Sequence, residues 1–237
     1  MSTQDLVERL DSSRSTVRRT LAALEEAGLI RMVHGGATLA HGKERAGSLA
    51  APPDPVEMLK EKRRIAAAAA RLIKPGDTIF VDTGSTTHQL LPHLRNIPGL
   101  TVLTNDIHIA HELVNNPNVS VVLTGGNLGT GTPYCLVGPV AEHTIGLFVA
   151  NLCIIGAAGI DPLRGITDPF QEVALVKKAM VRQATKVVLV VDHTKLGQIH
   201  KALVVPAQAI HHLITDAGAN PQQLARLRAT TIDISLC

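Results

Sequence analysis

The segment TIFVDTGSTT, from Thr78 to Thr87, has the pattern of a buried strand followed by a turn. Its apolar residues predict a short buried strand that ends at Asp82, and Gly84 indicates a tight turn after it. The hydroxyl-rich segment Ser85–Thr87 then leads into a predicted helix. A strand, a tight turn and a helix start in this order bring backbone N–H groups and hydroxyls together, and such groups bind anions.

This turn predicts a pocket for a phosphorylated small molecule. Glycine lets the backbone approach a phosphate closely. Asp82, at the carboxyl end of the strand, is placed to accept hydrogen bonds from sugar hydroxyls. An ordinary strand-to-helix turn, in which a hydroxyl caps the helix, is the alternative interpretation of the same residues.

Composition limits the class of protein. The chain has 237 residues, 45% of them apolar, which is enough for one sizeable α/β domain and a small second one. A net charge of +3 permits nucleic-acid binding without requiring it. The three cysteines lie far apart, so they indicate neither a disulfide framework nor a zinc site. Without a signal-peptide pattern or a membrane-length apolar run, the sequence predicts a soluble, cytoplasmic protein with no membrane partner.

Residues 1–39 have the pattern of a small DNA-binding domain. A first helix, a polar break and a second helix that ends at Gly28 are followed by a strand and a Gly-Gly turn, which reads as a β-wing. The second helix carries basic and hydroxyl side chains in its first turns, and these suit phosphates and base edges in a major groove. A solvated charged face on a two-helix hairpin is the alternative. The candidate DNA-binding residues of this helix are Arg14, Ser15, Thr16, Arg18 and Arg19.

Residues 40–57 read as a linker, because they mix prolines and glycines with charges and show no periodicity. The second domain, residues 58–237, opens with a predicted helix over Leu59–Ile73. Basic residues in that helix could contact DNA, but we interpret them as a solvated helix face. They are Lys60, Lys62, Arg63 and Arg64.

From Thr78 onward, short apolar runs alternate with helical stretches, which predicts an α/β fold with a mainly parallel, doubly wound sheet covered on both sides. Ligands of such sheets bind beyond the carboxyl ends of the strands. The predicted strands are Thr78–Val81, Leu100–Leu103, Val119–Leu123, Leu152–Ile155, Val187–Val191 and Leu213–Ile214, and the predicted helices lie near 107–115, 139–147, 171–184 and 221–228. Polar residues that follow five of these strands are expected to converge on one edge of the sheet.

The chain resembles the DeoR family of bacterial transcriptional regulators over nearly its whole length. In the first domain the similarity is carried by SRSTVRRTL (13–21), LEEAGLI (24–30) and HGGA (34–37). In the second it is carried by DTGSTT (82–87), TN (104–105), GG (125–126), GAAGID (156–161), GIT (165–167), Glu172 with KKA (177–179), and DHTKLG (192–197).

For the first domain the resemblance implies a winged helix-turn-helix with Ser13–Ala27 as recognition helix, and His34 and Gly35 of the wing join the candidate DNA-binding residues. The family's DNA-binding domain opens with one further helix that precedes the helices seen here. We therefore expect an N-terminally truncated winged helix-turn-helix, and an upstream start that would complete it.

For the second domain the resemblance implies a sensor of a phosphorylated sugar, with Gly84–Thr87 holding the phosphate. Lys195 is expected to contact phosphate or hydroxyl groups, and Asp82 and Glu172 to contact hydroxyls. The expected effector-binding residues are Asp82, Gly84, Ser85, Thr86, Thr87, Thr104, Asn105, Gly125, Gly126, Glu172, Asp192 and Lys195.

We therefore predict a homo-oligomeric repressor of a carbohydrate catabolic operon that binds operator DNA under the control of a sugar phosphate and needs no cofactor. A sugar-phosphate isomerase is the rival, because the sensor domain resembles that fold. Isomerisation requires a positioned acid-base group; Ala158 stands where those enzymes have an acidic loop, which leaves Glu172, so we predict no enzyme. A sugar-phosphate binding module without DNA binding is a third interpretation. His108, His111 and Glu112 have metal-ligand spacing, but we interpret them as surface residues.

Overall fold

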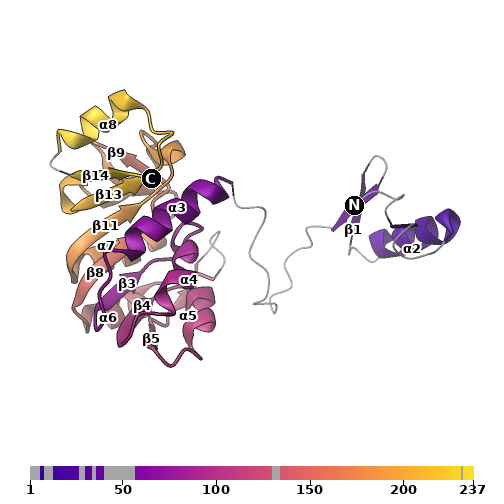
Figure 1. Cartoon of the computed structure of the whole chain (residues 1–237), viewed down its shortest axis with the longest axis horizontal. Helices are drawn as coiled ribbons and strands as arrows, with labels where there is room; N and C mark the ends of the chain where they lie inside the picture. The colour runs from indigo at the N-terminus through magenta and orange to yellow at the C-terminus, as the bar shows by residue number, and fades with distance from the viewer. Residues whose placement is uncertain are drawn as a thin grey trace. The chain divides into compact units, whose positions relative to one another are not determined.

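A computed structural model describes residues 6–7, 13–26, 30–33, 36–39, 57–129, 134–230 and 232–237. The chain divides into two compact units, Met1–Pro52 and Pro53–Cys237, and Figure 1 shows the whole chain. No helix in the described ranges is long and apolar enough to cross a membrane.

The described part of the first unit consists of a helix and a hairpin. Helix α2 (Arg14–Glu26) is capped by Ser13, whose Oγ accepts a hydrogen bond from the backbone N–H of Thr16 at 3.2 Å. Val17 and Leu21 are buried on one face of α2. Strands β1 (Ile30–Val33) and β2 (Gly36–Leu39) pair antiparallel. The predicted second helix and the predicted strand are confirmed.

The second unit is built on a seven-stranded sheet in the order β14-β13-β11-β8-β3-β4-β5. Every neighbouring pair in this sheet is parallel, so the predicted α/β fold with a doubly wound parallel sheet is confirmed. The strands are β3 (Thr78–Val81), β4 (Leu100–Thr104), β5 (Val119–Leu123), β8 (Ala150–Ile155), β11 (Ala184–Val190), β13 (His212–Thr215) and β14 (Asp233–Leu236).

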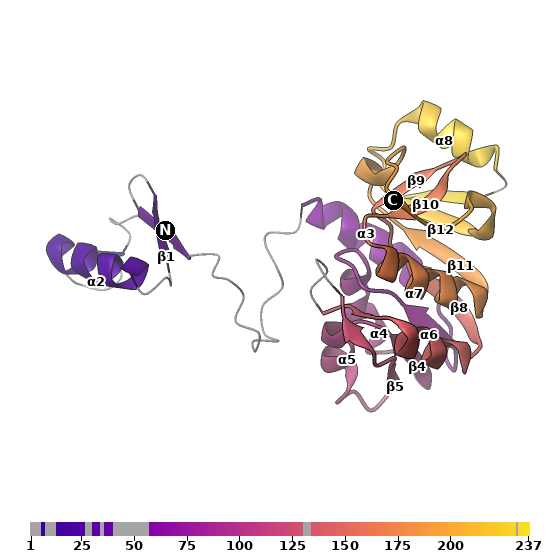
Figure 2. The ribbon, with the colours of Figure 1, turned by 180° about the vertical axis from the view of Figure 1, so that it is seen from behind.

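Helices cover both faces of this sheet. Helices α3 (Leu59–Ala70), α4 (Leu91–Leu94) and α5 (Ile107–Leu113) lie over one face (Figure 1), and α6 (Pro139–Gly146) and α7 (Gln171–Arg182) lie over the other (Figure 2). Alternate residues of one strand enter different cores: Ile79 and Val81 pack with the first set of helices, and Phe80 packs with the second set and with α8 (Pro221–Arg228). Burial on both faces explains why the strands read as continuous apolar runs.

A smaller antiparallel sheet, in the order β12-β10-β9, lies outside the elements that we predicted. Its strands are β9 (Gly159–Asp161), β10 (Gly165–Asp168) and β12 (Ala202–Val205). A two-stranded ribbon of β6 (Asn127–Leu128) and β7 (Leu136–Val137) is also new. Such short strands contain too few residues to show a period of two. The small sheet matters for the site because β10 leads directly into α7.

Candidate functional site

The strand order reverses beside β3. From β3 the chain adds β4 and β5 on one side, and β8, β11, β13 and β14 lie on the other. In open parallel sheets, ligands bind beyond the carboxyl ends of the strands at such a reversal, because the connecting helices lie on opposite faces and leave a crevice. The loops that follow β3 and β8 therefore mark the expected position of a binding site.

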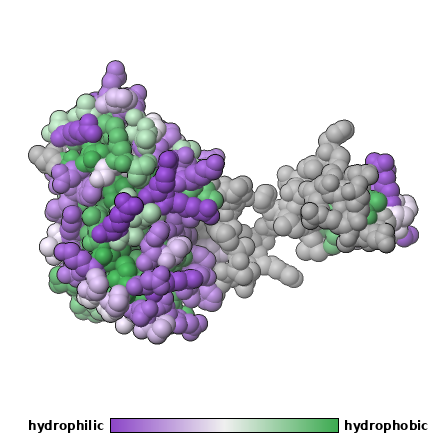
Figure 3. All heavy atoms as spheres, in the orientation of Figure 1, coloured by the Kyte–Doolittle hydropathy of each residue, from purple (hydrophilic) through white to green (hydrophobic). Residues whose placement is uncertain are grey.

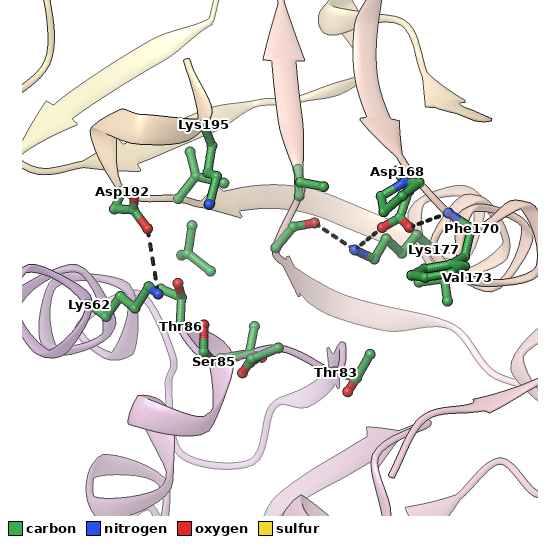
Figure 4. Close-up of a pocket in the computed structure, with 18 residues that line it drawn as sticks. Lys62, Thr83, Ser85, Thr86, Asp168, Phe170, Val173, Lys177, Asp192 and Lys195 are labelled. Carbon is green, nitrogen blue, oxygen red and sulfur yellow. Dashed lines mark hydrogen bonds and ion pairs between the residues drawn. The ribbon is translucent and has the colours of Figure 1, made fainter. Parts of the chain in front are cut away.

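A cavity of about 270 Å³ lies at this position. It is bounded by the loop after β3, the loop after β8, the turn between β10 and α7, the end of β11 and one side chain from α3 (Figure 4). The lining residues are Lys62, Thr83, Gly84, Ser85, Thr86, Thr87, Gly156, Ala157, Ala158, Asp168, Pro169, Phe170, Val173, Lys177, Val190, Val191, Asp192 and Lys195.

The loop after β3 presents hydroxyls and backbone groups to the cavity. Gly84 has a φ of 154°, and its carbonyl oxygen accepts from Thr87 Oγ1 at 2.8 Å, which closes the turn. Thr86 is buried and Ser85 is exposed. Within the described part of the chain, the backbone N–H groups of Ser85 and Thr86 donate to no protein acceptor. Such N–H groups with adjacent hydroxyls can bind an anionic oxygen.

A buried network fixes this loop from behind. Asn105 Oδ1 accepts from the backbone N–H of Thr83 at 3.2 Å. Asp106 Oδ2 accepts from Thr83 Oγ1 at 2.5 Å and contacts His88 Nε2 at 2.7 Å. Burial acts to raise the pKa of Asp106, but its hydrogen bond to His88 holds that pKa below the ordinary value. The loop is therefore held in place before any ligand arrives.

Two lysines make one end of the cavity cationic. Lys62, from α3, has a side chain that is only 8% exposed, and its Nζ lies 3.7 Å from Asp192 Oδ2. Lys195 lies beside them, and Figure 4 shows Lys62, Lys195 and Thr86 directed toward one another. Burial lowers the pKa of Lys62; Asp192 opposes this effect, and Lys195 adds to it. Among the described residues that line this end, Asp192 is the only carboxylate, and its single negative charge does not balance two lysines.

The other end contains a buried cluster of opposite charges. Lys177 Nζ lies 3.0 Å from Asp168 Oδ2 and 3.3 Å from Asp82 Oδ2, and it donates to the Gly156 carbonyl oxygen at 3.2 Å. Burial acts to lower the pKa of Lys177, but the two carboxylates raise it above the ordinary value. Lys177 is therefore a cation shared between two carboxylates. Lys177 and Asp168 both line the cavity.

The titration of Asp82 leads to a prediction. Burial raises the pKa of Asp82 from 3.8 to about 6, so the folded chain takes up this proton at a higher pH than the unfolded chain does. The charged carboxylate costs stability at neutral pH, and that cost falls as pH decreases through the folded-state pKa. We expect the unfolding free energy of the wild type, relative to Asp82→Asn, to rise by about 1 kcal/mol from about pH 7 to about pH 5.

Urea unfolding of both proteins at the two pH values measures this difference. Histidines whose pKa values are lowered in the folded chain, such as His108 and His212, make the protein less stable as pH falls through the same range. Both proteins contain these histidines, so their effect cancels in the comparison. A stability difference that does not change with pH would contradict the raised pKa of Asp82.

The structure brings six of the predicted effector-binding residues to the cavity wall. These are Gly84, Ser85, Thr86, Thr87, Asp192 and Lys195. The other six lie elsewhere: Asp82 is fully buried behind the wall, Thr104 and Asn105 are buried behind the loop, Gly125 and Gly126 form the turn after β5, and Glu172 is exposed on α7.

Three charged residues of the cavity, Lys62, Asp168 and Lys177, were not among the expected effector-binding residues. The interpretation of the basic residues of α3 as a solvated face is wrong for Lys62, although Lys60, Arg63 and Arg64 are exposed, and Figure 3 shows hydrophilic side chains over the outer face of α3. The helical spacing could have predicted that Lys62 is buried. Lys62 lies three, four and seven residues before Ile65, Ala66 and Ala69, which are buried on the same helix face.

The same spacing could have predicted that Lys177 is buried, because it lies four residues after Val173 and three before Met180, which are both buried on α7. No sequence pattern predicted that Asp168 lies at the cavity. It reaches the cavity because β10 pairs with β9 and β12, and the sequence pattern did not reveal either pairing.

The candidate DNA-binding residues of α2 lie on its outer side. Arg14, Ser15, Arg18 and Arg19 are exposed, and Thr16 is half-buried. Ser13 Oγ contacts the hydroxyls of Ser15 and Thr16 at 2.9 and 2.8 Å, so these hydroxyls already take part in the start of the helix. His34 and Gly35 lie outside the described residues.

The histidines of α5 are arranged without a metal-ligand geometry. The ring of His108 packs against that of His88 with centroids 5.1 Å apart and planes tilted by 59°, and Glu112 forms an ion pair with Arg95 at 2.7 Å. Across the residues that the structure describes, no three His, Cys, Asp or Glu side chains are grouped so that they could hold a metal ion.

Comparisons with known families match both units. Residues 57–217 match the DeoR C-terminal sensor domain, and residues 1–43 match the DeoR-like helix-turn-helix domain. The HTH-type transcriptional regulator GolR of Listeria innocua is 38% identical over 216 residues, which cover 91% of this chain and 84% of that protein. The glycerol-3-phosphate regulon repressor of Escherichia coli is 29% identical over 239 residues, which cover 100% of this chain and 92% of that protein.

Among solved structures, the chain is similar to a D-ribose-5-phosphate isomerase in complex with phospho-erythronic acid. The TM-score is 0.43 and the sequence identity is 16%, over 60% of this chain and 54% of that one.

Proposed function

Because the chain belongs to the DeoR family of transcriptional regulators, we propose that it represses a carbohydrate catabolic operon and that a phosphorylated sugar, bound in the cavity of the second unit, controls its DNA binding. Its relatives are transcriptional regulators and repressors, not enzymes. In this proposal residues 1–39 form the DNA-binding domain, residues 40–57 the linker and residues 58–237 the sensor domain.

The observation that carries the proposal is the cationic end of the cavity. Lys62 and Lys195 meet the hydroxyl-bearing loop 84–87 there, and Asp192 is the one carboxylate among the described residues that line this end. Lysine ammonium groups, hydroxyls and backbone N–H groups together favour a phosphate, because each donates a hydrogen bond to an anionic oxygen. An unphosphorylated sugar would bring no anionic oxygen to these lysines, and Lys62 would keep Asp192 as its ion-pair partner.

The opposite end suits the sugar part of the ligand. The Asp168 carboxylate can accept from hydroxyls, and Phe170 and Val173 supply an apolar wall. A volume of about 270 Å³ fits a small metabolite rather than a nucleotide-sized ligand. One relative is named for the glycerol-3-phosphate regulon, which agrees with a ligand of this class.

Arg14, Arg18 and Arg19 of α2 are proposed to contact operator DNA. Arginine at the start of a recognition helix contacts phosphates and base edges in the major groove. A homo-oligomer would present two such helices to the half-sites of a palindromic operator. The effector would change how firmly the oligomer holds DNA by binding more tightly to one of its two states.

Binding of the full chain to DNA from immediately upstream of its own operon, with and without a panel of sugar phosphates, tests the proposal. One sugar phosphate is expected to change operator affinity by about 5- to 150-fold, as is typical of allosteric coupling. The matching unphosphorylated sugar should leave operator affinity unchanged. A wild type whose operator affinity no sugar phosphate alters would overturn the proposal, and ligand binding without any DNA binding would favour the simple binding module.

Two variants separate the roles of the two units. Thr86→Ala, in the cavity, is expected to weaken the response to effector by about tenfold, because a hydroxyl donor to the phosphate is lost. Arg18→Ala is expected to weaken operator binding and to reduce the slope of log affinity against log salt by about 1, because one phosphate contact is lost. Loss of operator binding in Thr86→Ala would contradict this division.

A further inference from the structure

Lys62 connects the cavity to the beginning of the second unit. Helix α3 is the first helix after the linker, and its other basic residues, Lys60, Arg63 and Arg64, are exposed. Lys62 instead turns inward, and only 8% of its side chain is exposed. Burying a lysine is unfavourable unless an anion compensates for the lost hydration, so this position indicates a role for the charge inside the cavity.

The anion that Lys62 now contacts is a weak partner. Its Nζ lies 3.7 Å from Asp192 Oδ2, which is longer than a charge-assisted hydrogen bond of about 2.7 to 2.9 Å. Lys195, of like charge, faces the same space. A phosphate between the two lysines would offer several anionic oxygens, so it would compete with Asp192 for Lys62.

We propose that Lys62 transmits effector occupancy to α3, and so to the linker and the DNA-binding domain, by exchanging Asp192 for the phosphate of the effector. This inference rests on the proposed function and names the regulation of the same cavity. Lys62 and Asp192 act as positioning residues. Without effector, Lys62 ties α3 to the end of β11 through Asp192; with effector, it ties α3 to the ligand.

The packing of α3 allows such an exchange to move it. Helix α3 contacts the short helix η1 (Thr87–Leu90), which begins in the phosphate loop, and it also contacts β11 and β13. A ligand held by the loop and by Lys62 therefore acts on α3 from two sides. An effector shifts an equilibrium only when its contacts differ between the two states, and the partner of Lys62 supplies that difference.

The residue that joins the linker to α3 is strained. Met58 precedes the first turn of α3 with a φ of 58° and a ψ of 33°, in the left-handed region that residues other than glycine rarely adopt. Its carbonyl oxygen accepts from the backbone N–H of Lys62 at 2.9 Å. The conformation of this junction is therefore linked directly to the backbone of the residue that contacts the ligand.

Two substitutions with opposite expected effects test the exchange. Lys62→Gln removes the cation. Asp192→Asn removes the competing charge, and the oxygen of its side-chain amide can still accept from the backbone N–H of Thr194, as Asp192 Oδ1 does at 3.0 Å. Lys60→Gln is the matched control, because it makes the same change at an exposed position two residues away on the same helix.

The first measurement is the affinity of the full chain for inorganic phosphate by calorimetry. We expect phosphate to bind about tenfold more weakly to Lys62→Gln and about tenfold more tightly to Asp192→Asn, because the two changes remove an attractive and a competing charge. Lys60→Gln should stay within about twofold of the wild type. A merely structural role for the pair would weaken binding in both variants. That result, or equal affinities in all four proteins, would overturn the inference.

The second measurement is hydrogen exchange of residues 57–70 with and without saturating phosphate. Phosphate should change the exchange of the first turn of α3 in the wild type and in Lys60→Gln, but not in Lys62→Gln. An unchanged wild-type helix at saturation would overturn the inference, as would a Lys62→Gln helix that responds like the wild type.

These measurements use no DNA, so their failure is distinct from that of the proposed function, which is judged by the response of operator binding to sugar phosphates. A wild type that binds no phosphate at all would overturn the inference, and the proposed function would still be judged by the response of operator binding to sugar phosphates.

Discussion

Replacing Lys177 by methionine is expected to destabilise the second unit by about 3 to 5 kcal/mol. The Lys177 ammonium lies between the Asp82 and Asp168 carboxylates, and all three side chains are at most 6% exposed. Methionine has a similar length but no charge, so two buried carboxylates would face each other without a cation. Removing one partner of a buried ion pair is costly because the remaining charge stays unsolvated.

Urea unfolding at neutral pH measures this loss. Lys178→Met is the matched control, since Lys178 follows Lys177 on α7 but is only half-buried, and it should change stability by no more than about 0.5 kcal/mol. The Asp82→Asn, Lys177→Met double variant should recover part of the loss, because one unpaired carboxylate is then gone. Equal effects of Lys177→Met and Lys178→Met would show that the buried cluster contributes nothing specific.

Gly165→Ala is expected to cost about 3 kcal/mol or more, because two effects combine. Gly165 has a φ of 77°, which is unfavourable for alanine. A Cβ added there would also lie 2.3 Å from the Val205 carbonyl oxygen and 2.8 Å from the Cα of Pro206. Because both atoms belong to the backbone, the β10–β12 pairing must shift, and Asp168 at the end of β10 would shift with it.

Gly146→Ala provides the comparison for this prediction. Gly146 is the last residue of α6, and nothing lies within 4 Å of a Cβ added there. Alanine is a better helix former than glycine, so stability should stay the same or rise by up to about 1 kcal/mol. Thermal unfolding of both variants separates them. A Gly165→Ala protein as stable as Gly146→Ala would contradict the close approach of β10 to β12.

Much of the architecture could be predicted because it depends on local patterns. The runs at Thr78–Val81 and Val119–Leu123 are rich in apolar and β-branched residues, and they match β3 and β5. The helices that alternate with them imply a parallel sheet. The strands β9, β10 and β12 escaped prediction, since they have only three or four residues and β12 pairs with β10 from a distant part of the chain.

In the candidate site, too, local features could be predicted and tertiary contacts could not. The turn at Gly84–Thr87 is a local feature of strand, glycine and hydroxyls, so the sequence predicted the turn, and the binding of an anion there stays a prediction. Asp82 was expected at the ligand because it ends a strand. Folding buries it behind the cavity wall against Lys177, and which side chain covers a strand end depends on the helix packed above it.

Consecutive residues therefore encode the family, most strands and helices of the large sheet, and the turn at Gly84–Thr87. Which charged side chains meet depends instead on how the sheet and its helices fold together. Lys62 and Lys177 come from helices on opposite faces of the sheet, and they enter one cavity because the strand order reverses between β3 and β8. The physical reason is that a side chain's charge acts through distances in space, which the folded sheet sets and the spacing of residues along the chain does not.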